Sequence, residues 1–249
     1  MPISRNTLDW LHTGAATVHL TTAGLFYKLL SADDSERQKN PDAPGTRYDR
    51  DLAFLLPVFP LLSSLNHMVS VGSPTLYTAF LNNKTNPLRW IEYSVSAGVM
   101  LWLIARLIGI KDTRTLISLA MANAVLQYLG YLIEEARARN AEPKQIRQLL
   151  LAAWGVHLTI WVQLFIAFYS ALNDAKIELP TLVYTILPIM FVLFSAFGLL
   201  ETLWALGKID DFEAVELGYL VLSVTSKVFL TFMVYFGVFR DPDIDTRQI

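Results

Sequence analysis

The chain has 249 residues, of which 53% are hydrophobic and only 17% are charged. This composition is typical of membrane proteins rather than of soluble globular domains. A net charge of -2 gives no basic surface for nucleic acid, and the absence of cysteine excludes disulfides, thiolate metal sites and cysteine nucleophiles. The four histidines lack metal-binding spacing, so a metal site is not expected.

Seven apolar stretches are long enough to cross about 30 Å of hydrocarbon as helices that rise about 1.5 Å per residue. In chain order the predicted spans are Leu8–Leu30, Asp51–Val71, Pro87–Ile110, Thr113–Ile133, Ile146–Leu172, Pro180–Leu206 and Phe212–Phe239. Helix starts are indicated by Asn86 before a proline, and by Asp112 and Asp210 before the fourth and seventh spans. No repeat or linker interrupts this pattern. Residues 1–249 are therefore predicted to form one all-α domain, a seven-transmembrane-helix bundle.

The N-terminal segment lacks a cleavable signal pattern, so the first span is expected to stay in the protein. Lysine and arginine number seven on the N-terminal side of the spans and eleven on the other side. Five of the eleven belong to the first loop and its edge, which is also rich in acidic residues. Without them the two sides are almost equal, so the positive-inside rule does not fix the orientation.

Lys227 lies in the middle of the last apolar span, whereas the other lysines lie in loops or at the ends of spans. A charge at the centre of a bilayer costs roughly 2.5–3.5 kcal/mol on insertion scales, so such residues usually serve a function. An uncharged lysine amine can condense with an aldehyde to form a Schiff base. The position predicts covalent chemistry at this amine. An interhelical ion pair without a covalent ligand is the alternative.

A protonated Schiff base needs a buried anion nearby, and the third span offers Glu92. Ser96 and Met100 follow at i+4 and i+8, so they share its helix face. Arg89, one turn earlier, is expected to counterbalance Glu92 or to lie in a water-filled cavity beside it. The alternative for Arg89 and Glu92 is an ion pair across one turn of the helix. The alternative for Ser96 is a small residue that allows close contact between helices.

On the seventh span, Ser223 precedes Lys227 by four residues and can face the same nitrogen. The segments RWIEYSVSAG and LGYLVLSVTSK, with His19 and His67 in the first two spans, resemble the heliorhodopsins, a divergent branch of microbial retinal proteins. The resemblance covers all seven spans. It implies all-trans retinal bound to Lys227 as a protonated Schiff base, Glu92 as the counterion, and a hydrogen bond from Ser223 near the imine.

The same resemblance implies that His19 and His67 belong to a polar cavity beside the imine, although each could be an ordinary interhelical hydrogen-bonding residue. It also implies a homodimer in the lipid bilayer of the cell membrane, with the N-terminus in the cytoplasm. The charge counts do not support this orientation, so it rests on the resemblance alone.

A retinal polyene requires a slot lined by aromatic and small apolar groups. The candidates that the sequence offers for this slot are Met100, Asn123, Gln127, Gly130, Trp161, Phe194 and Phe197. Aromatic side chains at helical spacing are equally compatible with ordinary packing between helices.

Proton-pumping retinal proteins usually carry a second carboxyl eleven residues after the counterion, and here that position is Leu103, which cannot donate a proton. Glu201, near the end of the sixth span, is either an interfacial residue or part of a proton path. These features favour a photoreceptor that signals to an unknown partner without efficient pumping. The alternatives are a light-activated proton or ion transporter or channel, and a light-dependent regulator of a partner enzyme. The sequence shows no nucleophile–base pair, so a conventional enzyme is not expected.

Overall fold

The computed structural model describes residues 5–39, 50–173 and 182–240, and these ranges contain helices but no strand. The long helices are α1 (Arg5–Lys39), α2 (Arg50–Gly72), α4 (Pro87–Leu107), α5 (Thr113–Ala138), α6 (Pro143–Asn173), α7 (Val183–Ala205) and α8 (Phe212–Val234). A short helix, α3 (Pro74–Asn83), follows α2, and a π-helical turn, η1 (Tyr235–Phe239), follows α8. The predicted all-α class and the seven-helix bundle are confirmed.

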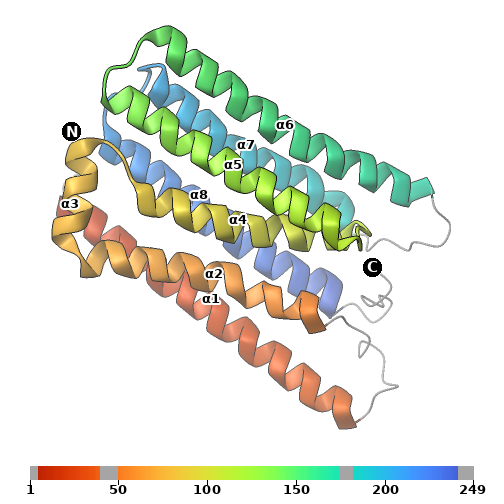
Figure 1. The fold of residues 1–249 in the computed structure, drawn as a ribbon. Coiled ribbons are helices and arrows are strands. Elements are labelled where there is room, and N and C mark those ends of the chain that lie inside the picture. The colour runs from red at the N-terminus through yellow and green to blue at the C-terminus, as the bar shows by residue number, and fades with distance from the viewer. Residues whose placement is uncertain (1–4, 40–49, 174–181, 241–249) are drawn as a thin grey trace.

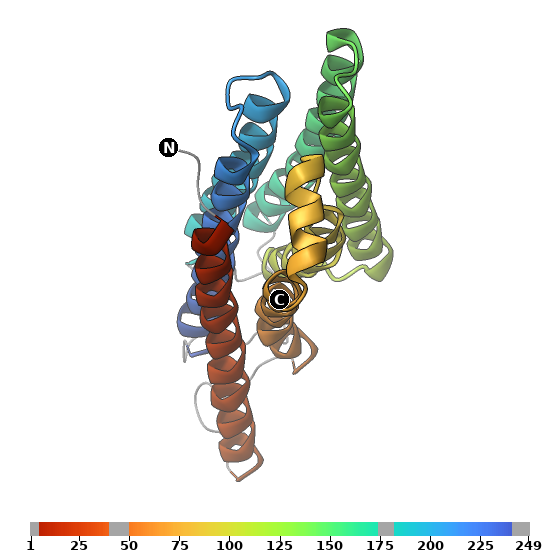
Figure 2. The same ribbon diagram turned by 90° about the vertical axis from the view of Figure 1, so that its left-hand side faces the viewer.

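The long helices run side by side as one elongated bundle (Figure 1). Each of them packs against the next long helix in the chain, and α8 also packs against α1 and α2, which closes the bundle. The bundle end that holds α3 faces the viewer in Figure 2. There Arg5, at the start of α1, donates a hydrogen bond from Nη1 to Thr78 Oγ1 over 2.9 Å.

The segment between the second and third predicted spans contains a helix that the sequence analysis did not anticipate. Pro74 occupies the first turn of α3, where its missing N–H costs nothing. Lys84 ends the helix in the left-handed conformation with a φ of 53°. The helix turns Tyr77 inward, where only 1% of it is exposed. This ten-residue helix is too short to cross a membrane, so a search for long apolar spans does not detect it.

The predicted helix starts are confirmed at two of three positions. The side chain of Asn86 accepts a hydrogen bond from the Arg89 backbone N–H, and Asp112 accepts one from the Thr115 backbone N–H over 2.9 Å. The Thr115 hydroxyl and backbone hydrogen bonds lower the pKa of the exposed Asp112 carboxyl. The prediction for Asp210 was wrong, because its neighbour Asp211 caps α8.

Asp210 instead accepts a hydrogen bond from Arg137 Nη2 over 3.3 Å. Two adjacent aspartates can both precede a helix, and the sequence alone does not distinguish the one whose oxygen reaches the free backbone N–H groups.

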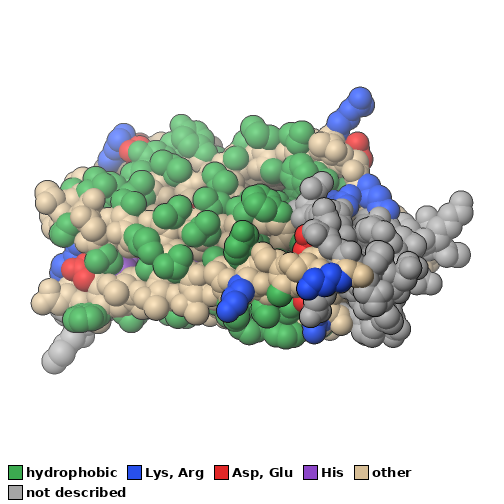
Figure 3. All heavy atoms as spheres, turned by 90° about the horizontal axis from the view of Figure 1, so that it is seen from below, with side chains coloured by type: hydrophobic (Ala, Val, Ile, Leu, Met, Phe, Trp, Pro, Cys, Tyr) green, Lys and Arg blue, Asp and Glu red, His purple; other side chains and the backbone are tan. Residues whose placement is uncertain are grey.

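Within the described ranges, five helices are long and apolar enough to cross a membrane: Ala53–Gly72, α5, α6, α7 and Phe212–Phe239. The helices α1 and α4 are not among these five, and α4 carries Arg89, Glu92 and Arg106. Arg89 and Glu92 are buried within the bundle, so these charges are kept away from lipid. Hydrophobic side chains cover the face shown in Figure 3, and most charged side chains gather towards its two ends.

Candidate functional site

Lys227 is buried in the middle of α8, with 2% of the residue exposed. Its Nζ donates hydrogen bonds to Glu92 Oε1 over 3.1 Å and to Ser223 Oγ over 3.0 Å. A serine of α2, Ser63, donates to the same Glu92 oxygen over 2.6 Å. The ring centroid of Tyr93 lies 4.8 Å from Nζ, within the range of a cation–π contact. Residues from α2, α4 and α8 thus surround one amine.

Helical spacing explains how these groups converge. Ser223 and Lys227 are four residues apart on α8, so their side chains lie on one face. Ser96 follows Glu92 by one turn on α4 and is fully buried. The Ser96 hydroxyl has no hydrogen-bond partner among the described residues. A polar group in such a place is available to a ligand near Glu92.

Arg89 does not pair with Glu92, which corrects the expectation that it counterbalances this carboxylate. Its guanidinium reaches away from Glu92 and forms ion pairs with Glu134 of α5 through Nη2 and with Glu216 of α8 through Nη1. All three side chains are buried. The guanidinium also lies 3.9 Å from the ring centroid of Tyr219. Two buried carboxylates attract Arg89 more strongly than one that already has a lysine partner.

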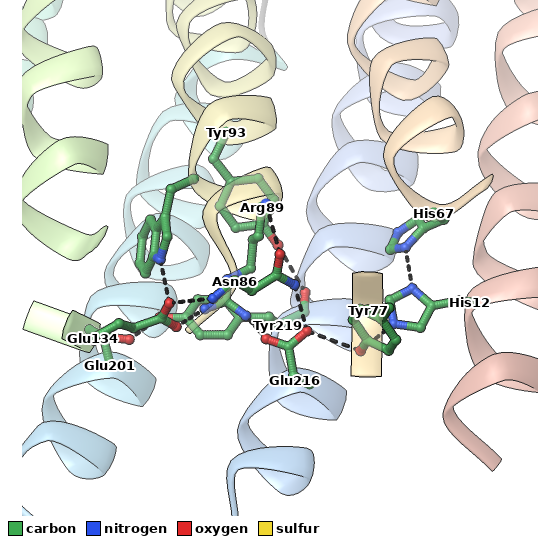
Figure 4. A network of polar contacts seen from close by, with 11 residues as sticks. His12, His67, Tyr77, Asn86, Arg89, Tyr93, Glu134, Glu201, Glu216 and Tyr219 are labelled. Carbon is green, nitrogen blue, oxygen red and sulfur yellow. Dashed lines mark hydrogen bonds and ion pairs between the residues drawn. The ribbon is translucent and has the colours of Figure 1, made fainter. Parts of the chain in front are cut away.

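Asn86 and Trp90 complete the cluster around Arg89. The Asn86 backbone N–H donates to Glu134 Oε2 over 3.0 Å, and its Nδ2 donates to Glu216 Oε2 over 2.8 Å. The indole Nε1 of Trp90 donates to Glu134 Oε2 over 2.7 Å. Figure 4 shows this arrangement, in which α4, α5 and α8 meet through one arginine. We call Arg89, Glu134, Glu216, Asn86 and Trp90 the arginine cluster.

Three histidines form a buried group between α1 and α2. His19 and His67 stack with ring centroids 5.5 Å apart. His12 Nδ1 lies 2.8 Å from His67 Nδ1. His67 follows Ser63 by four residues on α2, so this group lies one helical turn from the serine that contacts Glu92. The two predicted histidines therefore do come together, one helical turn from Ser63.

A cavity of about 90 Å³ with an open mouth extends from Lys227 between α4, α5, α6, α7 and α8. Of the predicted lining residues, it is bordered by Met100, Gln127, Gly130, Phe194 and Phe197. A Cβ atom at Gly130 would come within 2.3 Å of the Trp90 ring, so a side chain there would displace the indole from the cavity wall.

The structure does not place Asn123 and Trp161 among the residues that border this cavity. Asn123 Nδ2 donates to the backbone oxygens of Tyr93 and Ser94, both over 3.2 Å, and thereby ties α5 to α4. Trp161 packs against Phe194 with ring centroids 5.5 Å apart. Both residues lie behind the wall that they were expected to form.

Glu201 borders the cavity and is 4% exposed, so its side chain is buried within the bundle. Its Oε2 accepts a hydrogen bond from Tyr219 over 2.7 Å, and its Oε1 has no partner among the described residues. Leu103 is fully buried among apolar side chains.

Several polar residues of the site were not predicted from the sequence: His12, Ser63, Tyr77, Glu134 and Glu216. Helical spacing contained a signal for four of them. Glu216 precedes Ser223 by seven residues, and His12 precedes His19 by seven. Glu134 follows Gln127 by seven residues and Ser63 precedes His67 by four, so each of the four shares a helix face with a predicted residue. Nothing comparable marked Tyr77.

A comparison with protein-family models matches residues 10–239 to the heliorhodopsin family. The chain belongs to the heliorhodopsin family. This membership implies an integral membrane protein of the retinal photoreceptor type, with retinal as its chromophore, and the family is generally non-enzymatic. A comparison with curated proteins found no significant match.

Solved structures of similar fold come from microbial rhodopsins. The transmembrane domain of rhodopsin phosphodiesterase from Salpingoeca rosetta superposes with a TM-score of 0.70 at 15% identity, covering 94% of this chain and 84% of that one. Cyanorhodopsin from Calothrix sp. NIES-2098 gives 0.66 at 15% identity, covering 93% and 91%. Cyanorhodopsin from Tolypothrix sp. NIES-4075 gives 0.66 at 12% identity, covering 99% of each chain. At these identities the likeness shows a shared fold.

Proposed function

We propose that the chain binds all-trans retinal through a Schiff-base linkage to Lys227, with Glu92 as counterion, and that it signals by a conformational change without efficient ion pumping. The observation that carries this proposal is a buried amine 3.1 Å from a buried carboxylate, at the border of a cavity between the helices. When bound, retinal supplies absorption of visible light and photoisomerisation.

The residues around the cavity fit this chromophore. Phe194, Phe197 and Tyr93 supply flat apolar surface, and Met100 adds an adaptable thioether. Glu92 stabilises positive charge at the Lys227 nitrogen, because a like-sized neutral group would leave that charge buried without a partner.

The hydroxyls of Ser223 and Ser63 hold the pair in place. Ser223 accepts a hydrogen bond from Nζ, and Ser63 donates one to Glu92. Fixed dipoles of this kind set the energy of a buried charge and therefore contribute to the absorption wavelength. Asn123 and Trp161 support the wall from behind.

A light-activated proton or ion transporter is the second candidate, and Glu201 favours it. This buried carboxyl borders the cavity and keeps one oxygen without a described partner, so it can take up or release a proton near the chromophore. Leu103 opposes efficient pumping, since an apolar side chain cannot return a proton to the Lys227 nitrogen.

The homodimer, the cytoplasmic N-terminus and a signalling partner, including a partner enzyme regulated by light, belong to this proposal. Chemical cross-linking in native membranes tests the dimer, and protease accessibility of an N-terminal tag in sealed vesicles tests the orientation. Co-purification in the dark and in the light tests the partner.

The decisive test of the proposed function is the spectrum of the purified protein produced with all-trans retinal. We expect a visible absorption band that hydroxylamine removes under illumination. A colourless protein that is folded by circular dichroism would refute the proposal.

A further inference from the structure

Four buried side chains on four different helices form a continuous hydrogen-bonded chain. His67 Nδ1 of α2 lies 2.8 Å from His12 Nδ1 of α1, and His12 Nε2 lies 2.7 Å from the hydroxyl of Tyr77 on α3. The Tyr77 hydroxyl lies 3.1 Å from Glu216 Oε2 of α8. Figure 4 shows the chain leading from the histidines into the arginine cluster. We call these four residues the relay.

The hydrogen-bond pattern assigns the proton positions in the relay. Glu216 is paired with Arg89 and is therefore an ionised acceptor, so the single hydroxyl proton of Tyr77 points to it. The Tyr77 oxygen must then accept from His12, which places a proton on His12 Nε2. A neutral imidazole has one protonated nitrogen, so His12 Nδ1 is an acceptor. His67 must consequently carry its proton on Nδ1.

This assignment leaves His67 Nε2 as a buried lone pair. That atom has no hydrogen-bond partner among the described residues. His67 lies one helical turn from Ser63, which contacts the same Glu92 oxygen as Lys227. The open end of the relay therefore lies one helical turn from the serine that contacts Glu92, and its other end lies in the arginine cluster.

We propose that the relay carries a proton from the His67 end to Glu216 when a proton leaves the Lys227 nitrogen under light. The incoming proton binds His67 Nε2, and the proton on His67 Nδ1 passes to His12 Nδ1. The proton on His12 Nε2 passes to the Tyr77 oxygen, whose own proton passes to Glu216 Oε2. Each member gains and loses one proton, except Glu216, which becomes neutral. This inference rests on the proposed function of Lys227.

The transfer leaves every hydrogen bond of the relay satisfied, only with reversed direction. Glu216 then donates to Tyr77, Tyr77 to His12, and His12 to His67. Both states therefore avoid the cost of a buried polar group without a hydrogen-bond partner. The proton can return by the same path, so it remains within the protein.

Neutralising Glu216 changes the charge balance of the arginine cluster. Arg89 then keeps one charged partner, Glu134, where it had two. The other cation next to the relay is Arg5, whose guanidinium lies 4.6 Å from the Tyr77 ring centroid and is paired with Asp9 over 2.9 Å. The helices α3, α4, α5 and α8 meet at this cluster, so the relay links a proton near Lys227 to the packing of this bundle end.

The proton assignment can be tested on the protein without retinal. Nitrogen-15 NMR of histidine-labelled protein, with His12→Gln and His67→Gln for resonance assignment, reports the protonated nitrogen of each ring. We expect the Nε2–H form for His12 and the Nδ1–H form for His67. The opposite form at either residue would overturn the proposed direction of transfer, whether or not the protein binds retinal.

The transfer itself is tested by light-induced infrared difference spectroscopy of the retinal-loaded protein. We expect a new C=O band from a protonated carboxyl that is absent in Glu216→Gln and reduced at least fivefold in Tyr77→Phe. The matched control is Tyr235→Phe, which also removes a buried hydroxyl bonded to a carboxylate, here Asp33, but lies outside the relay. The control should keep the band.

Tyr77→Phe leaves Glu216 and its ion pair in place, so the test does not depend on the folding of Glu216→Gln. A carboxyl band of full size in Tyr77→Phe would overturn the relay, and so would a wild-type spectrum without such a band. A coloured, photoactive protein with either result would still support retinal binding at Lys227, which separates the failure of the relay from that of the proposed function.

Discussion

Lys227 on α8 and Glu92 on α4 lie 3.1 Å apart, nitrogen to oxygen, although 135 residues separate them in the chain. Both are buried, and the only hydrogen-bond donors that the structure describes around this Glu92 oxygen are Lys227 and Ser63. Removing one member of a buried ion pair leaves the other uncompensated, so each residue constrains the other. This pair is the basis for the first two predictions.

Replacing Lys227 with alanine should give a protein without a visible band, because no other amine borders the cavity in the part of the chain that the structure describes. Absorption spectra after production with all-trans retinal provide the measurement. Lys208→Ala is the control, since it removes a lysine outside the bundle core and should keep the colour. A visible band in Lys227→Ala would exclude this residue as the attachment point.

Replacing Glu92 with glutamine should shift the absorption into the near ultraviolet at neutral pH. The substitution removes the negative charge that favours a proton on the Schiff-base nitrogen, so this proton is lost at a lower pH than in the wild type. A pH titration of the absorption band measures the effect, and Glu142→Gln, at an exposed position, is the control. An unchanged visible spectrum without added halide would point to another counterion.

Replacing Ser223 with alanine should leave the pigment assembled and shift its absorption band or photocycle rate modestly. The hydroxyl lies 3.0 Å from the Lys227 nitrogen, and a hydrogen bond to a charged group contributes about 1.5–3 kcal/mol. Flash photolysis and steady-state spectra measure both quantities. The control is Ser118→Ala, whose exposed hydroxyl bonds only its own helix. A variant indistinguishable from this control would make Ser223 a packing residue.

Much of the bundle could be predicted because the length and the apolar character of each span are visible in consecutive residues of the sequence. The Lys227–Ser223 contact was equally accessible, since both residues lie on one helix four positions apart. The partner Glu92 followed from chemistry, because a buried cation needs an anion. Each of these inferences uses local spacing or the high cost of an unpaired charge.

The partners of Arg89 could not be predicted in this way. Glu134 and Glu216 are 45 and 127 residues from it, and Glu92 was the nearest carboxylate in sequence. Which carboxylate the guanidinium reaches depends on how α4, α5 and α8 pack, and spacing along one helix contains no such information. Asn123 illustrates the same limit, because its side chain turns to backbone oxygens of α4 rather than to the cavity.

Replacing Arg89 with glutamine should lower the free energy of unfolding by about 3–5 kcal/mol, because it leaves two buried carboxylates without a cation. Thermal unfolding of the detergent-solubilised protein measures the change. Arg139→Gln breaks an ion pair with Glu135 in which the arginine side chain is 74% exposed, and it should cost less than about 1 kcal/mol. Equal effects of the two substitutions would contradict a structural role for the arginine cluster.

Illumination should produce little or no net proton transport. A pump must return a proton to the Lys227 nitrogen from one side only, and Leu103 is a fully buried leucine where pumps carry a carboxyl. A proton displaced towards the histidines can instead return by the way it came, so the cycle closes without net transfer.

The measurement is the light-induced pH change of cells or liposomes with and without a protonophore, beside a known pump at equal protein amount. A sustained, protonophore-sensitive change of the size given by that pump would overturn the prediction. A small current that disappears in Glu201→Gln would show that the carboxyl beside Tyr219 passes protons, and would favour the transporter.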